Sequence, residues 1–116
     1  MTPSRTIELR SPGFEGIALC KRSVPDPAVG QVLLRMGGSC LNFHDAVVMR
    51  GLIPGLPYPL VPLSDGCGEV VAVGEGVTRV ATGDRVMPNF YPRWIDGRPT
   101  PRGKKLILAI GTCQLF

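Results

Sequence analysis

Glycine and proline interrupt this chain so often that only short structural elements fit between them. The 116 residues include 15 glycines and 12 prolines, and four of the prolines lie within the segment 54–62. Proline lacks an amide donor and fixes its own backbone, while glycine permits tight turns. The sequence therefore predicts many short strands joined by turns, and an extended, irregular segment over 54–62.

Apolar runs between the turns mark the expected strands. Five such runs cover residues 6–9, 17–20, 31–36, 66–74 and 85–88. The run 66–74 is the clearest strand, and we expect Val71 and Val73 to point from it into the core. A chain of 116 residues is the length of one domain. The expected fold is mainly β, a small, partly open barrel of mostly antiparallel strands with one short helix.

One segment carries helix signals instead. Asn42 is a favourable N-cap residue, and Asp45 follows it at the spacing of a capping box. Apolar residues continue at helical spacing to Arg50, and Gly51 suits the position just after a helix end. The pattern predicts a short helix over about 43–50.

The positive charge of the chain is concentrated near its end. The formal net charge is +4, and the segment from Arg93 to Lys105 alone accounts for it, with five basic residues and one acid. A nucleic-acid-binding face needs basic residues gathered across the fold, so we expect no nucleic-acid partner.

The cysteines and apolar runs give no sign of secretion or of a membrane. The four cysteines contain no C-x-x-C pair, and the N-terminus lacks the apolar run of a signal peptide. The longest aliphatic run, Leu106 to Ile110, is too short to span a bilayer. We expect free thiols, a cytoplasmic location and no membrane partner.

Several motifs, in order, resemble the catalytic domain of the medium-chain dehydrogenase/reductases, closest to the quinone oxidoreductase group. The resemblance covers roughly residues 6–97 and depends on the order and gaps of five motifs. They are the Pro-rich turn and strand Pro25–Met36, the N-x-x-D helix Asn42–Asp45 followed by Arg50-Gly51, the S-D-G-x-G-x-V start of a strand at Ser64–Val70, and the turns Gly74–Val77 and Gly83–Val86.

This resemblance implies a GroES-like domain over residues 1–100, followed by a divergent tail over 101–116 whose run Leu106–Ile110 could serve as a replacement strand. The domain would be the N-terminal, substrate-side part of an oxidoreductase that uses NADPH to reduce a small molecule of the quinone, enone or alcohol/aldehyde class. The chain contains no G-x-G-x-x-G between a strand and a helix, so we expect it to lack the Rossmann domain, to hold no cofactor and to be inactive in isolation. Two alternatives remain open: a free-standing small β-barrel that binds a partner, or a truncated product without function.

The family's zinc branch tests whether a metal is expected. That branch has a cysteine three residues before the aspartate of the helix, and a His-Glu pair at the next glycine-rich strand. Here these positions hold Asn42, Ser64 and Asp65, and asparagine and serine are poor zinc ligands. The resemblance therefore implies a zinc-free protein with no metal residues.

The same resemblance supplies the candidate site residues. Asn42 and Asp45 would be catalytic, and Asn42, Phe43 and Asp65 would line the substrate and cofactor cleft. The alternative interpretation is that Asn42 and Asp45 only cap the helix, and that Asp65 only satisfies donors of its turn. The single histidine, His44, is interpreted as a surface residue rather than a proton donor.

Two positions depart from the family pattern. Leu63 stands where the family usually has glycine, and Ile53 where quinone oxidoreductases often have tyrosine.

The resemblance also bears on self-association. In the intact family a cofactor domain covers the cleft wall near Asn42 and Asp65. Without it, apolar surface would be exposed, so we expect self-association.

Overall fold

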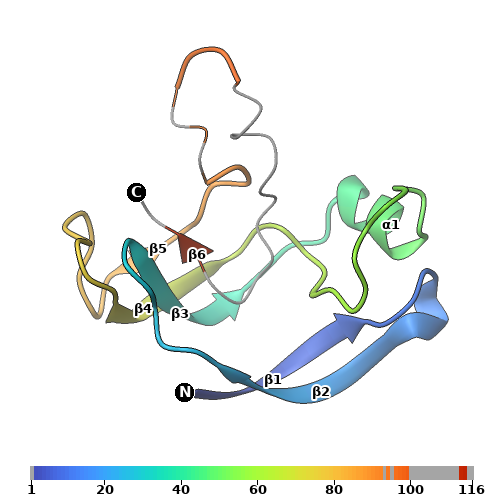
Figure 1. Cartoon of the computed structure of the whole chain (residues 1–116), viewed down its shortest axis with the longest axis horizontal. Helices are drawn as coiled ribbons and strands as arrows, with labels where there is room; N and C mark the ends of the chain where they lie inside the picture. Colours follow the sequence, from blue (N-terminus) through green and yellow to red (C-terminus); the bar gives the residue numbers. More distant parts are fainter. Residues whose placement is uncertain (1, 93, 95, 100–112, 115–116) are drawn as a thin grey trace.

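The described part of the chain folds into two antiparallel sheets, one short helix and one turn of 3-10 helix (Figure 1). The computed structural model describes residues 2–92, 94, 96–99 and 113–114. The prediction of a mainly β fold with one short helix is confirmed, and the two sheets do not close on one another, as expected for a partly open barrel.

The first sheet is a two-stranded hairpin. Strands β1 (Thr2–Leu9) and β2 (Ile17–Val24) pair without interruption from Thr2 opposite Val24 to Leu9 opposite Ile17. Both strands are longer than the predicted runs. The single turn of 3-10 helix, η1 (Phe14–Gly16), lies in the connection between them.

The hairpin joins the rest of the molecule where β1 ends. The backbone N–H of Leu9 donates to the carbonyl of Leu60 at 2.8 Å, and the N–H of Leu60 donates back at 3.0 Å. Leu60 lies in the Pro-rich segment, which runs without regular strand or helix, as predicted. Leu9 is fully buried at this junction.

The second sheet has four strands in the order β5-β4-β3-β6, all antiparallel. Its centre is the pair β3 (Gln31–Gly38) and β4 (Cys67–Val73), and β5 (Arg85–Val86) extends it at one edge. The β3–β4 register contains a bulge: Leu33 pairs with Ala72 and Leu34 with Val70, which leaves Val71 without a partner of its own.

This sheet carries the core. Val32 and Val70 are fully buried, and four partly buried side chains pack against them: Leu34, Val77, Val80 and Val86. The prediction that Val71 and Val73 point inward is wrong, because Val71 is only half-buried and Val73 is 40% exposed. Alternation along a strand gives two possible faces, and the prediction chose the wrong one: the buried positions of β4 are Gly68 and Val70, which precede the bulge.

The tail contributes the other edge of this sheet. Strand β6 (Cys113–Gln114) pairs with Gln31 and Val32 at the start of β3. The predicted replacement strand, Leu106–Ile110, lies outside the described residues, and the division of the chain at residue 100 stays a prediction. Within the part of the chain that the structure describes, no helix has the length and apolar character needed to cross a membrane.

The helix α1 (Phe43–Met49) begins and ends where the local signals predicted. Gly51 follows it with a φ of 71°, and the N–H groups of Gly51 and Leu52 donate to the carbonyls of Val48 and Val47, at 3.0 and 3.1 Å. This is a Schellman motif, which needs a left-handed residue at Gly51. A side chain there would lie 2.5 Å from Cβ of Pro12, so glycine also lets the helix end pack on the hairpin connection.

Candidate functional site

The site begins at the N-terminus of α1, where Asn42 and Asp45 form the predicted capping box. The backbone N–H of Asn42 donates to Oδ2 of Asp45 at 2.7 Å, and the side chain of Asn42 in turn faces the backbone of Asp45. Asp45 is only 2% exposed. A buried carboxylate needs hydrogen-bond donors, and this cap supplies one of them. The interpretation that Asn42 and Asp45 cap the helix is therefore correct, but Asn42 also has a contact outside the cap.

Asp65 brings a second element to the same place. Its Oδ2 accepts a hydrogen bond from Nδ2 of Asn42 at 2.8 Å, and its Oδ1 accepts one from the backbone N–H of Cys40 at 3.1 Å. Asp65 lies two residues before the start of β4, and Asn42 immediately precedes α1. Two predicted site residues that are 23 positions apart are thus hydrogen-bonded to each other.

Glycine at position 66 allows this approach. A side chain on Gly66 would collide with Cε of Met36 and lie 2.8 Å from the carbonyl oxygen of Gly38. The segment before β4 therefore lies directly against the end of β3, which also leads into the segment around Cys40. That contact holds Asp65 beside the start of α1.

The backbone is strained just before Asp65. Leu63 has a φ of 74°, and among the described residues it is the only non-glycine residue with a positive φ. This conformation is unfavourable for a residue with a bulky side chain. It gives a physical reason for the glycine that the resembling family usually has there. The next residue, Ser64, is buried, with 4% exposed.

An aromatic cluster adjoins the helix, and the sequence analysis did not predict it. The ring of His44 meets that of Phe90 edge-on at 5.4 Å, Phe90 meets Tyr91 at 4.6 Å, and Tyr91 meets Trp94 at 6.0 Å. His44 is half-buried by this packing, so the interpretation of it as a plain surface residue is incomplete. The sequence signal for this cluster is the close spacing of Phe90, Tyr91 and Trp94 after the turn 83–86.

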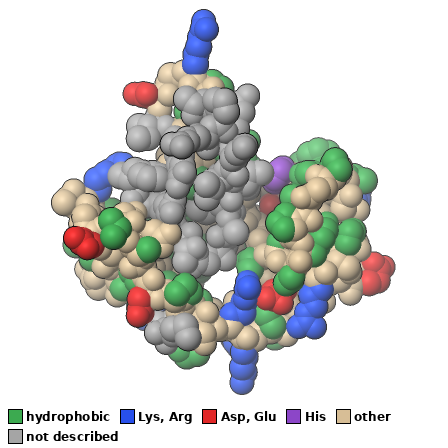
Figure 2. Space-filling model, viewed as in Figure 1, with side chains coloured by type: hydrophobic (Ala, Val, Ile, Leu, Met, Phe, Trp, Pro, Cys, Tyr) green, Lys and Arg blue, Asp and Glu red, His purple; other side chains and the backbone are tan. Residues whose placement is uncertain are grey.

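Figure 2 shows how this region lies on the molecular surface. The purple side chain of His44 lies at the edge of the lobe on the right, beside apolar side chains. Phe43, the neighbouring predicted cleft residue, is 86% exposed, and its place in a cleft stays a prediction. The described lysine and arginine side chains are dispersed in this view rather than gathered on one face.

The described residues include no group of three or more His, Cys, Asp or Glu side chains that could hold a metal ion. The zinc branch has its ligands at three positions, which are Asn42, Ser64 and Asp65 in this chain. Asn42 is hydrogen-bonded to Asp65, and Ser64, which follows the strained Leu63 in sequence, is buried. An amide and a hydroxyl are weak ligands for zinc.

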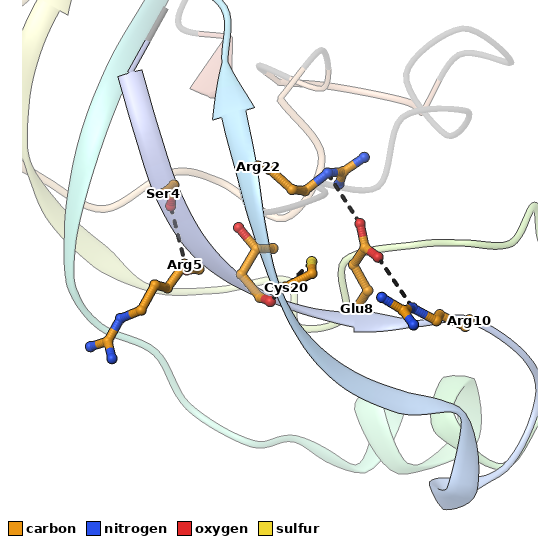
Figure 3. A network of polar contacts seen from close by, with 7 residues as sticks. Ser4, Arg5, Glu8, Arg10, Cys20 and Arg22 are labelled. Carbon is orange, nitrogen blue, oxygen red and sulfur yellow. Dashed lines mark hydrogen bonds and ion pairs between the residues drawn. The ribbon is translucent and has the colours of Figure 1, made fainter.

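A second polar cluster lies on the hairpin, away from α1 (Figure 3). The carboxylate of Glu8, almost wholly buried, lies 3.1 Å from Nε of Arg22 and 3.7 Å from Nε of Arg10. Burial raises the pKa of the nearby Cys20 thiol above its usual value, and the hydrogen bond and charge of Glu8 raise it further. Cys20 donates to the carbonyl of Thr6 at 3.3 Å. The thiol, which is a poorer nucleophile than the thiolate, is therefore the favoured form of Cys20.

Comparison with known proteins places these features in a family. The model of the alcohol dehydrogenase GroES-like domain matches residues 28–112. A zinc-type alcohol dehydrogenase-like protein of Schizosaccharomyces pombe is 42% identical over 90 residues, which cover 76% of this chain and 26% of the relative. A chloroplastic quinone-oxidoreductase homolog of Spinacia oleracea is 36% identical over 78 residues, covering 65% of this chain and 24% of the relative.

Comparison with solved structures also shows similarity, in one case to a protein that binds NADPH. A mycobacterial protein, solved in complex with NADPH, superposes with a TM-score of 0.66 at 31% identity, covering 73% of this chain and 27% of that one. This chain spans about a quarter of the length of the curated relatives it matches.

Proposed function

Since the chain belongs to the alcohol dehydrogenase GroES-like domain family of the medium-chain dehydrogenases/reductases, we propose that it is the substrate-side domain of a zinc-free, NADPH-dependent oxidoreductase. The observation that carries the proposal is the bond between Asn42 and Asp65. It joins the residue before α1 to the segment just before β4, and so connects two of the five motifs on which the resemblance depends.

The zinc-free assignment is supported by side-chain chemistry rather than by names. One relative is called zinc-type, but in this chain the three relevant positions hold Asn42, Ser64 and Asp65. The amide of Asn42 is already oriented by Asp65 at 2.8 Å, and a zinc ion prefers thiolate or imidazole ligands.

The described residues do not fit a dinucleotide anchor. A pyrophosphate is held where a glycine-rich turn leads from a strand into a helix. Here the turn after β4, which includes Gly74 and Gly76, leads toward β5, and the one described α-helix follows Asn42 rather than a glycine-rich turn. NADPH would supply the hydride from a separate dinucleotide-binding domain, and this chain would supply one wall beside the nicotinamide.

That wall defines the substrate class. Asn42 offers a neutral amide, and Asp65 and Asp45 place two carboxylates close to it. Like charges repel, so a neutral carbonyl compound fits this wall better than an anionic one. We propose a quinone, an enone or an aldehyde as the acceptor. The free thiols Cys20, Cys40 and Cys67 support a cytoplasmic location for the enzyme.

A second candidate is a free-standing binding module. The observation that favours it is the pairing of β6 with β3, because the tail then takes part in the sheet. Such a module would need no second domain to complete its fold.

The first test uses the isolated chain. We expect no saturable NADPH binding at micromolar concentrations in a fluorescence titration, no NADPH oxidation with an enone, and no bound zinc by metal analysis. The pyrophosphate anchor would lie in the separate dinucleotide-binding domain, and Asn42 and Ser64 stand where the zinc branch has ligands. Stoichiometric zinc would overturn the zinc-free assignment. Turnover by this chain alone would overturn the proposal that a separate domain binds NADPH.

The second test looks for activity of this chain when it is joined to a dinucleotide-binding domain. Residues 1–100 replace the matching region of the S. pombe relative, with which the chain shares 42% identity. The chimera should oxidise NADPH in the presence of a quinone or enone. A folded chimera that binds NADPH and reduces none of the three acceptor classes would favour the binding module.

A further inference from the structure

Asp65 contacts the segment before α1 with both of its oxygens. Oδ1 accepts the backbone N–H of Cys40 at 3.1 Å, and Oδ2 accepts Nδ2 of Asn42 at 2.8 Å. The two donors lie two residues apart on one segment, and the carboxylate comes from a different segment, just before β4. Asp65 therefore fixes both the backbone of this segment and the side chain of Asn42.

This contact determines which way the amide of Asn42 faces. A carboxylate only accepts hydrogen bonds, so the nitrogen of the amide, and not its oxygen, must face Asp65. The oxygen then faces the backbone of Asp45 in the capping box. The amide nitrogen carries two hydrogens, of which Asp65 takes one.

The second N–H of Asn42 is available to a ligand. It has no partner among the residues that the structure describes, and the side chain of Asn42 is exposed. Because its oxygen is turned toward the helix backbone, Asn42 presents a donor to the solvent and not an acceptor. The nearby carboxylates of Asp65 and Asp45 oppose an anionic acceptor, so the matching group is a neutral carbonyl oxygen.

We propose that Asp65 is a positioning residue that holds the free N–H of Asn42 toward the carbonyl oxygen of a neutral enone or quinone. A donor held in advance at this oxygen costs little reorganisation when the ligand binds. The proposal rests on the proposed function, because it assigns the polar contact of the substrate on the wall described above.

The test follows the amide of Asn42 directly by NMR of the 15N-labelled chain. Asn42→Ser identifies its pair of side-chain signals by their loss. The probe is 2-cyclohexen-1-one, a neutral enone, and cyclohexanecarboxylate is the anionic comparison. We expect the enone to shift the Asn42 amide signals in a saturable way, and the carboxylate to leave them unchanged.

The decisive variant is Asp65→Asn, which leaves a single acceptor oxygen for two donors. We expect enone binding to weaken about tenfold, the effect of one misplaced hydrogen bond. The two amide protons of Asn42 should also become more alike in shift. Asp84→Asn is the matched control, because Oδ2 of Asp84 accepts the N–H of Ala81 at 2.8 Å in a turn outside the site. It should leave enone binding unchanged.

A second variant protects the test against unfolding. Asn42→Ser keeps an N-cap oxygen for α1 but has no amide donor, so it should also lose enone binding. The backbone signals of β3 and β4 report whether each variant is folded.

The outcomes separate this proposal from the proposed function. Equal enone binding by folded Asp65→Asn and the original chain would refute the positioning role, and enone binding that leaves the Asn42 amide unshifted would refute its donor role. In both cases the substrate-side assignment stands. If the enone shifts no signal of the folded chain, the positioning role is refuted, and the activity of the chimera decides the substrate-side assignment separately.

Discussion

The β1–β2 hairpin and the β3–β4 pair are both antiparallel and are built from strands of seven or eight residues, but different side chains hold them in place. Val32, Leu33 and Val70 of the second pair are buried apolar residues, whereas Leu9 is the only such residue of the hairpin. Leu19, in the middle of β2, is 68% exposed.

Polar contacts show the opposite distribution. The ion pair that involves the hairpin has a nearly buried carboxylate, since the side chain of Glu8 is 11% exposed. On β3–β4, the ion pair between Arg35 and Glu69 is exposed on both sides, although its atoms lie only 2.7 Å apart. A two-stranded hairpin is at best marginally stable in water without further packing. In this molecule the sheet depends on apolar burial, whereas the hairpin depends on its junctions with Leu60 and with the end of α1, and on one polar cluster.

The largest expected effect comes from placing a charge in each region. Val70→Asp buries an unpaired carboxylate and should cost more than about 4 kcal/mol, enough to unfold a domain of ordinary stability. Leu19→Asp should change the free energy of unfolding by less than about 0.5 kcal/mol, since its side chain already faces water. Urea denaturation followed by circular dichroism measures both. Equal effects of the two substitutions would show that the contrast between the regions is wrong.

A smaller effect should separate the two ion pairs. Glu8→Gln removes the charge that lies between two arginines and should cost about 1 kcal/mol. Glu69→Gln removes one partner of an exposed pair and should cost about 0.3 kcal/mol. Thermal melts at low and high salt compare them. If Glu69→Gln destabilises the chain as much as Glu8→Gln, then burial of the hairpin carboxylate contributes nothing.

The smallest expected effect concerns the segment that joins the two regions. Leu63 has a φ of 74°, so Leu63→Gly should raise the free energy of unfolding by up to about 1 kcal/mol, through relief of backbone strain. Leu60→Gly is the matched control: Leu60 forms the bridge to Leu9, and the same change should lower stability there. A loss of stability in both variants would mean that the side chain of Leu63 contributes more by packing than its backbone costs.

The features that were predicted from the sequence depend on neighbouring residues. The cap at Asn42, the left-handed Gly51 and the irregular Pro-rich segment follow from signals within a few positions, and the structure confirms all three. Those signals act through backbone hydrogen bonds and allowed dihedral angles, which hardly depend on the rest of the fold.

The features that were missed depend on residues far apart in the chain. The inward face of β4 was misplaced because alternation along a strand gives two possible faces, and only the packing of Val70 with Val32 of β3 decides between them. The contact between His44 and Phe90 joins α1 to the segment after β5, which are separated in sequence by the Pro-rich segment, β4 and β5. Asn42 and Asp65 were both chosen as site residues, but their hydrogen bond follows from the close approach at Gly66, which no local pattern reveals.

The pairing of β3 with β4 also determines the order in which the chain can fold. Val32 and Val73 are direct partners, yet roughly forty residues separate them, including the helix and the Pro-rich segment. The hairpin closes over a much shorter loop, from Leu9 to Ile17, so its strands can meet early, on the microsecond scale typical of hairpins. The central sheet must first overcome the entropy of closing a long loop, which slows folding. We therefore expect the part of the molecule with least buried apolar surface to be able to form first, and the part that holds most of the core to form later.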